Sequence, residues 1–211
     1  MNPIIVIAPM LLAALVSMLG RRSMKIGYFS IAMSLASLAI AIFLFIAFLN
    51  GGQTSQAFTW FSVAGLQFQI VTSTGILNMI LLLLISLVAP FILLYSVGFM
   101  RVPSDQGRYY AEICVFTASM MLLSISGSFL TLFIAWEMLG ITSYLLIGFY
   151  TAKDSAAFGA RKSITIIFIG DIAMLAALVL IYSSFSTFSF AQIISYQSAN
   201  PQSGLLTIPE L

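Results

Sequence analysis

One apolar run with a single acid at its centre sets the strongest limit on how this chain can fold. Residues 130–150 read LTLFIAWEMLGITSYLLIGFY, and Glu137 is the one charged residue among them. About 20 consecutive apolar residues form a helix long enough to cross the hydrocarbon core of a bilayer. A carboxylate at that depth costs about 2.5–3.5 kcal/mol on insertion scales, which indicates a use for the side chain. We therefore expect Glu137 to be functional; the alternative is a structural polar contact between two helices.

The composition agrees with a membrane protein and excludes several classes of site. Hydrophobic residues make up 61% of the chain and charged residues 7%, against about 25% charged residues in soluble domains. With one cysteine and no histidine, the chain has no side-chain set for an internal disulfide, a haem, an iron–sulfur cluster or a zinc ion. We expect no cofactor or metal on this chain, so any redox centre would lie on another subunit. The sequence also has no phosphate-binding glycine-rich loop, no nucleophile–histidine–acid set and no nucleic-acid-binding stripe.

The pattern of apolar runs predicts an all-α integral membrane protein with six transmembrane helices in a single membrane domain, residues 1–211. The expected helices cover residues 3–20, 26–49, 76–99, 109–125, 130–150 and 161–182. The first run has no basic residue before it, which favours a retained helix over a cleaved signal peptide. Three parts follow from this division: 1–100 with the first three helices, 109–183 with the next three, and an external tail at 184–211.

Residues 53–72 differ in kind from the rest. They are rich in β-branched and aromatic residues, contain no charge, and have Ala64-Gly65 near their centre. This pattern is typical of a short β-hairpin, which we expect to lie outside the hydrocarbon. An irregular loop is the alternative.

All eight basic residues fall into three of the connections between the expected helices. The N-terminus, the hairpin, the 126–128 turn and the tail have none. The positive-inside rule then places the three basic connections in the cytoplasm and both termini outside a cell membrane, plasma or inner. The eight residues are Arg21, Arg22, Lys25, Arg101, Arg108, Lys153, Arg161 and Lys162.

Two acids are expected near the midplane of the bilayer. Glu137 lies nine residues after the 126–128 turn, and Asp171 lies nine residues after Lys162, so each is about 14 Å from one end of its helix. Their helices are consecutive and antiparallel, so both acids should face a shared interior. A proton relay needs such groups; alternatively, a lysine on a helix from elsewhere pairs with one of them. For a third acid, Glu112, we expect either interfacial capping of the fourth helix or a function.

Several motifs together resemble a known family. YSVGFM at 95–100, LFIAWEMLGITSYLLIGFY at 132–150, RKS at 161–163 and GD at 170–171 follow one another in this order. They resemble the antiporter-like subunit of respiratory complex I, NADH–quinone oxidoreductase chain 5, and its relatives in Mrp-type sodium/proton antiporters and membrane-bound hydrogenases. The resemblance implies that Glu137, after Trp136, is the family's membrane glutamate and that Asp171 is its second acid. It also implies that Lys162 is its basic residue at the start of the sixth helix.

The resemblance also implies what is missing. In the family the glutamate works with a lysine on a broken seventh helix, inside two inverted five-helix repeats. The 211 residues correspond to the first six helices only, so we expect a second chain or a further C-terminal part to supply that lysine. Many relatives carry arginine three residues before the aspartate, where this chain has Phe168. Asp171 therefore lacks that partner on its own helix.

The function predicted from the sequence is a proton-translocating membrane subunit, or the N-terminal part of one, in a complex I-like NADH/quinone oxidoreductase. Its partners would be other membrane-arm subunits and the lipid membrane, with no nucleic acid. An Mrp-type cation/proton antiporter subunit and a non-conducting structural part of a membrane arm are the two alternatives.

Overall fold

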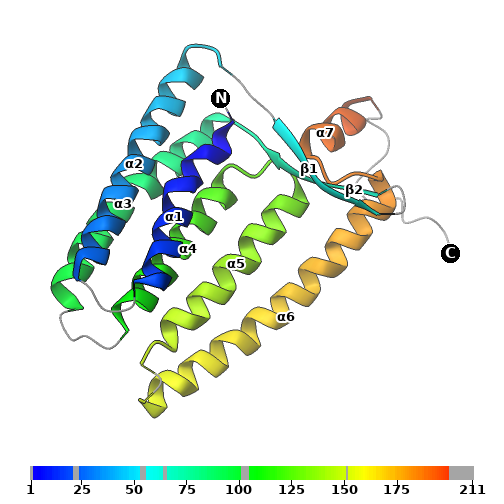
Figure 1. Ribbon diagram of the computed structural model, residues 1–211. Coiled ribbons are helices and arrows are strands. Elements are labelled where there is room, and N and C mark those ends of the chain that lie inside the picture. The colour runs from blue at the N-terminus through cyan, green and yellow to red at the C-terminus, as the bar shows by residue number, and fades with distance from the viewer. Residues whose placement is uncertain are drawn as a thin grey trace.

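The structure is a computed structural model that describes residues 2–20, 24–52, 56–63, 66–100, 105–150 and 152–199. Its helices lie side by side, with a two-stranded hairpin and a short last helix at one end (Figure 1). In chain order the elements are η1 (Pro3–Ile7), α1 (Ala8–Leu19), α2 (Met24–Leu49), β1 (Gln56–Val63), β2 (Leu66–Thr72), α3 (Ile76–Phe99), α4 (Gln106–Ser124), α5 (Phe129–Ile147), α6 (Asp154–Phe185) and α7 (Phe190–Ala199).

Four of these helices are long and apolar enough to cross a membrane. They are α2, α3, α5 and α6, with mean hydropathies of 2.6, 2.7, 1.7 and 2.7 over their most apolar windows. The first helical segment, Pro3–Leu19, is apolar but shorter. Helix α4 is not among the four, and polar residues such as Arg108 and Glu112 lie in its first two turns. The four apolar helices indicate a multi-pass membrane protein. The count of six transmembrane helices stays a prediction.

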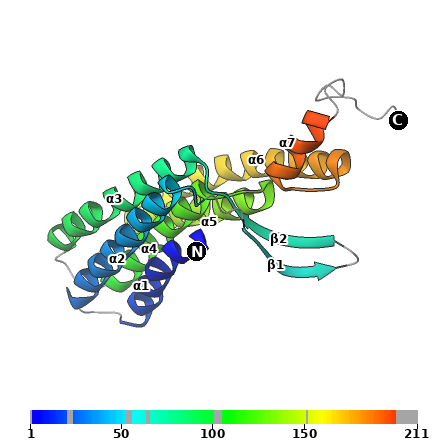
Figure 2. The same ribbon diagram turned by 90° about the horizontal axis from the view of Figure 1, so that it is seen from above.

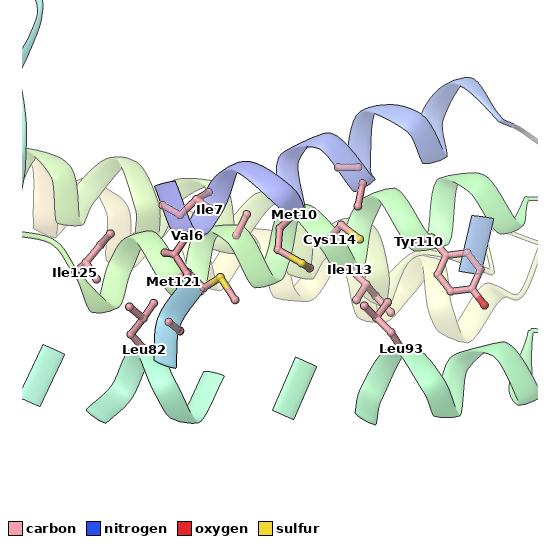
Figure 3. Packing of buried hydrophobic residues seen from close by; sticks show 14 of the residues in the cluster. Val6, Ile7, Met10, Leu82, Leu93, Tyr110, Ile113, Cys114, Met121 and Ile125 are labelled. Atoms are coloured by element: carbon pink, nitrogen blue, oxygen red, sulfur yellow. The ribbon is translucent and has the colours of Figure 1, made fainter. Parts of the chain in front are cut away.

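The hydrophobic core lies where α1 crosses α4 and α2 packs on α3. Met10 and Ala13 of α1 and Met121 of α4 are fully buried in it, as Figure 3 shows for the residues that it labels. Helix α5 packs against α4 on one side and α6 on the other. Helix α6 therefore lies at one edge of the layer of helices (Figure 1), and most of its apolar side chains are exposed.

Small side chains let α2 approach its neighbours. Ser30, Ser34, Ser37 and Ala41 recur at helical spacing and are all buried. The hydroxyl of Ser37 donates a hydrogen bond of 2.9 Å to the carbonyl oxygen of Val6 in η1. Small residues and interhelical hydrogen bonds are what hold helices together where the surroundings are apolar.

The predicted hairpin is confirmed. Strands β1 and β2 pair antiparallel from Gln56 opposite Thr72 to Val63 opposite Leu66, with a register shift between Thr59 and Phe61. Residues 53–55 and 64–65 of the predicted segment lie outside the described residues. Figure 2 shows the two strands projecting beyond the layer of helices.

The turn between α4 and α5 ties the hairpin to the end of α6. The Gly127 N–H donates to the Val71 carbonyl at 2.7 Å, and the Gly127 carbonyl accepts from the Phe190 N–H at 3.1 Å. Isolated bridges pair Thr72 with Ser126 and Ser128 with Ser189. A side chain at position 127 would meet Val71 and the backbone of Thr72 at 3.0–3.1 Å, so the close approach requires glycine here.

Two parts of the sequence interpretation need correction. Helix α6 begins at Asp154, so most of the expected 151–160 loop is helical. Asp154 in the first turn suits the helix dipole, and Ala156, Ala157 and Ala160 are strong helix formers. The expected tail also contains helix α7. Residues 200–211 of that tail, and Arg21, Arg22 and Arg101 among the basic residues, lie outside the described residues.

Candidate proton site between α5 and α6

Glu137 and Asp171 lie near the middle of two packed helices. Helix α5 starts at a local cap, because the Ser128 side chain accepts a hydrogen bond of 3.1 Å from the Thr131 N–H. Glu137 is then eight residues from the start of α5 and ten from its end. Asp171 is seventeen residues into α6, which is 32 residues long. The earlier start of α6 therefore leaves Asp171 at mid-helix, further from the basic end than the sequence suggested.

The contact between α5 and α6 brings these two acids to the same level. A Cβ atom at Gly140 would lie 3.2 Å from Cγ2 of Ile167, so the two helices meet closely there. Glu137 is three residues before Gly140, and Asp171 is four residues after Ile167. Because the helices are antiparallel, Glu137 and Asp171 each lie about one turn from the Gly140–Ile167 contact, toward the same end of the bundle. The carboxyl groups of Glu137 and Asp171 are close enough to interact electrostatically.

The two acids differ in their surroundings. Asp171 is 5% exposed, and its Oδ1 atom has no hydrogen-bond partner among the described residues. Glu137 is half-buried. A buried carboxyl oxygen without a partner is costly unless it is protonated, hydrated or paired with a donor from outside these residues. The Oδ1 atom of Asp171 thus needs a donor that the described residues do not supply.

The third predicted site residue is not part of this pair. Lys162 is exposed on α6 and lies nine residues before Asp171. No ion pair joins it to Glu137 or Asp171 in the part of the chain that the structure describes. Phe168, at the position where relatives carry arginine, is 59% exposed. It therefore faces away from the α5–α6 contact that covers Asp171.

Glu112 has an environment that the sequence interpretation missed. Helix α4 starts at Gln106, so Glu112 lies in its second turn, and the capping interpretation is wrong. Its side chain is 7% exposed and accepts a 2.6 Å hydrogen bond from Nε of Arg108, which is 44% exposed. The other oxygen, Oε2, is buried without a hydrogen-bond partner in the described segments. The spacing of four residues between a base and an acid on one helix was the available signal.

Within the described residues, no group of three or more histidine, cysteine or acidic side chains is arranged to hold a metal ion. The sequence expectation of no metal or cofactor on this chain stays a prediction.

The comparisons with known proteins place the chain among antiporter-like membrane subunits. Subunit L of the Mycobacterium tuberculosis NADH-quinone oxidoreductase is 38% identical over 140 residues, which cover 66% of this chain and 22% of that protein. Subunit A1 of the Staphylococcus aureus Na(+)/H(+) antiporter is 24% identical over 197 residues, 92% of this chain and 24% of that protein. The chain thus spans less than a quarter of the length of these relatives.

The fold agrees with this similarity. A chain in the structure of the Mrp complex from Dietzia sp. DQ12-45-1b superimposes with a TM-score of 0.76 over 95% of this chain and 22% of that chain, at 22% sequence identity. The family described as NADH:quinone oxidoreductase/Mrp antiporter, TM, matches residues 126–211, which include α5 and α6 with both central acids. Residues 126–211 of this chain therefore belong to the NADH:quinone oxidoreductase/Mrp antiporter transmembrane family.

Proposed function

We propose that this chain is the proton-translocating membrane subunit, or the N-terminal part of one, of a complex I-like NADH/quinone oxidoreductase. One observation carries the proposal: Glu137 lies opposite Asp171 at mid-helix, within the family's transmembrane region. The similarity to subunit L of an NADH-quinone oxidoreductase supports the choice of complex. Electron transfer would take place on other subunits, and this chain would move protons.

The carboxyl pair has the chemistry of a relay. Two carboxylates held together at low dielectric repel each other, so one proton shared between them stabilises the site. Glu137 is the more exposed of the two, so it is the group that exchanges its proton with water or with a cationic partner. Asp171 is the buried acid that faces Glu137 across the α5–α6 contact. Lys162, which we place on the basic side of the membrane, is exposed and makes no ion pair with either acid among the described residues.

The topology that fits this role has six transmembrane helices with both ends outside the cell membrane and the basic connections in the cytoplasm. Helix α4 supports it by packing between α1 and α5 as a member of the bundle. The starts of α2 and α6 lie at one end of the helices, and the hairpin and α7 lie at the other (Figure 1). Lys25 is in the first turn of α2, and Lys153 directly precedes α6. That separation of charge is the pattern of the positive-inside rule.

Cysteine labelling tests the sidedness. Cys114 is buried and would first be replaced by alanine. Ser155 in the first turn of α6 and Ser198 in α7 are both exposed, so each can carry a new cysteine. In intact cells a membrane-impermeant maleimide should label Ser198→Cys, and it should label Ser155→Cys only after permeabilisation. The reverse pattern would contradict the proposed orientation.

The second candidate function is that of an Mrp-type cation/proton antiporter subunit, favoured by the similarity to a Na(+)/H(+) antiporter subunit. Inverted membrane vesicles separate the two functions. A redox-linked pump acidifies the vesicle lumen when the electron donor is added. An antiporter instead dissipates an existing pH gradient when sodium is added, with no donor required.

Co-purification distinguishes the redox complex from the antiporter independently of transport. With the tagged chain as bait, a redox complex should bring iron–sulfur and quinone-site subunits, whereas an antiporter should bring only membrane subunits. Wild-type proton coupling in assemblies that carry Glu137 variants would favour the third candidate, a structural part of a membrane arm.

A further inference from the structure

A groove between α1, α4 and α5 lies on the opposite side of α5 from the proton site. Its volume is about 530 Å³. Its walls are apolar and include Met18, Val115 and Leu145. Its charged groups among the described residues are Asp105, just before α4, and Arg108 and the buried Glu112 of α4; Thr142 of α5 adds a hydroxyl. A groove with charged groups at one end and an apolar remainder matches an amphiphile better than a soluble ion.

The charged end of the groove lies at the level of an aromatic belt. Arg108 stacks over Phe149 at 5.7 Å, and Lys153 lies over Tyr150 at 5.2 Å. Tyr95, near the end of the neighbouring α3, is 73% exposed. Tyrosines and basic residues gather where a bilayer meets water. The polar end of the groove is therefore at headgroup depth, and its apolar part runs toward the acyl chains.

The charges in the groove define which headgroup fits. Arg108 uses one N–H for Glu112, and its guanidinium group has further N–H donors for a phosphate. The Oε2 atom of Glu112 is buried without a donor among the described residues, and Asp105 adds a second carboxylate. Among the described residues, the site thus offers one cationic and two anionic side chains. A headgroup with one phosphate and one N–H-bearing ammonium complements that set.

We propose that this groove binds a zwitterionic phospholipid with a primary ammonium group, such as phosphatidylethanolamine. The phosphate binds Arg108, the ammonium donates to Oε2 of Glu112 and to Asp105, and one acyl chain lies along Met18, Val115 and Leu145. A phosphatidylglycerol headgroup brings negative charge without a cation to two carboxylates. A phosphatidylcholine headgroup has no N–H to donate. The inference does not depend on the proton role of Glu137.

Photocrosslinking tests the proposal in the intact assembly purified from membranes in mild detergent. The probe is phosphatidylethanolamine with a photoreactive group on one acyl chain, and the readout is the yield of crosslinked α4 and α5 peptides. Unlabelled phosphatidylethanolamine should compete about tenfold better than phosphatidylcholine or phosphatidylglycerol, the scale of one charge-assisted hydrogen bond. Glycerophosphoethanolamine, the headgroup without acyl chains, should not compete, because the apolar walls contribute to binding.

Substitutions of the charged groove residues test where the lipid headgroup binds. Arg108→Gln and Glu112→Gln should lower the specific yield about tenfold, while Arg161→Gln, an exposed cation outside the groove, should leave it unchanged. If Glu112→Gln fails to assemble, Asp105→Asn replaces it, because Asp105 is exposed and its side chain does not cap α4. Equal competition by the three lipids, unchanged yields in the variants, or no crosslink because a protein helix fills the groove would each overturn the proposal.

Discussion

Replacing Glu137 with glutamine is expected to abolish proton translocation while the assembly remains intact. Glutamine keeps the shape of the side chain and its place opposite Asp171, but it cannot take up and release a proton. A positioned acid–base group contributes about 10²–10⁴-fold to a proton-transfer rate, so translocation should fall by about 10²-fold or more. The measurement is donor-driven acidification of inverted vesicles, followed with a pH-sensitive dye, alongside the rate of donor oxidation.

Matched variants make this result specific. Asp154→Asn removes an exposed acid from the first turn of the partner helix α6 and should leave translocation unchanged. Glu137→Asp keeps a carboxyl group on a shorter side chain and should retain partial activity. A Glu137→Gln assembly that pumps at the wild-type ratio would contradict the proton role. It would support a structural role if Glu137→Leu still disturbed packing.

Replacing Gly140 with leucine should separate α5 from α6 and disable the carboxyl pair. Even the Cβ atom of a new side chain would lie 3.2 Å from Cγ2 of Ile167, a stiff β-branched residue. Overpacking of this kind costs about 1–3 kcal/mol. Because a displacement of about 1 Å at a reacting centre costs about 10²-fold in rate, translocation should fall by a similar factor. The measurements are vesicle acidification and the melting temperature of the purified assembly.

Two further variants distinguish this effect from general misfolding. Gly140→Ala adds only the Cβ atom, and its gain of about 1 kcal/mol in helix propensity offsets the crowding, so its stability should be close to wild type. Ile167→Ala removes the opposing methyl groups and should restore much of the activity of Gly140→Leu. Additive losses in that double variant would show that the two residues are not coupled and that the proposed contact does not position the acids.

The sequence was most informative where one physical signal dominated. The apolar run around Glu137 predicted α5, because few structures other than a buried or membrane-spanning helix accommodate such a segment. The charge-free stretch at 53–72, rich in β-branched and aromatic residues, predicted the hairpin, which the structure describes at Gln56–Val63 and Leu66–Thr72. The pairing of Glu137 with Asp171 followed from their similar depth on consecutive helices; α5 and α6 do pack together near Gly140 and Ile167, while the role of the pair stays a prediction.

The sequence was least informative in polar segments, where helices and a side-chain ion pair were not recognised. Residues 154–160 contain serine, aspartate and glycine, which suggested a loop, yet they continue α6 as a helix. Helix α7 was missed because its polar residues resemble those of a tail, although Phe190 packs edge-on against Phe129 at 4.7 Å. Glu112 was misplaced because helix boundaries are uncertain by several residues from sequence alone, and a shift of three residues moved it out of the first turn.

The pair of helices that carries the two acids is fastened at both ends. A short connection joins Ile147 to Asp154, and at the opposite end the Phe129 N–H donates to the Phe188 carbonyl at 3.0 Å beside the Ser128–Ser189 bridge. Sliding of either helix along the other would break this hydrogen bond and this bridge. If the charge at the centre changes, we therefore expect rotation of the side chains and their hydration, rather than sliding of one helix along the other, to accommodate it.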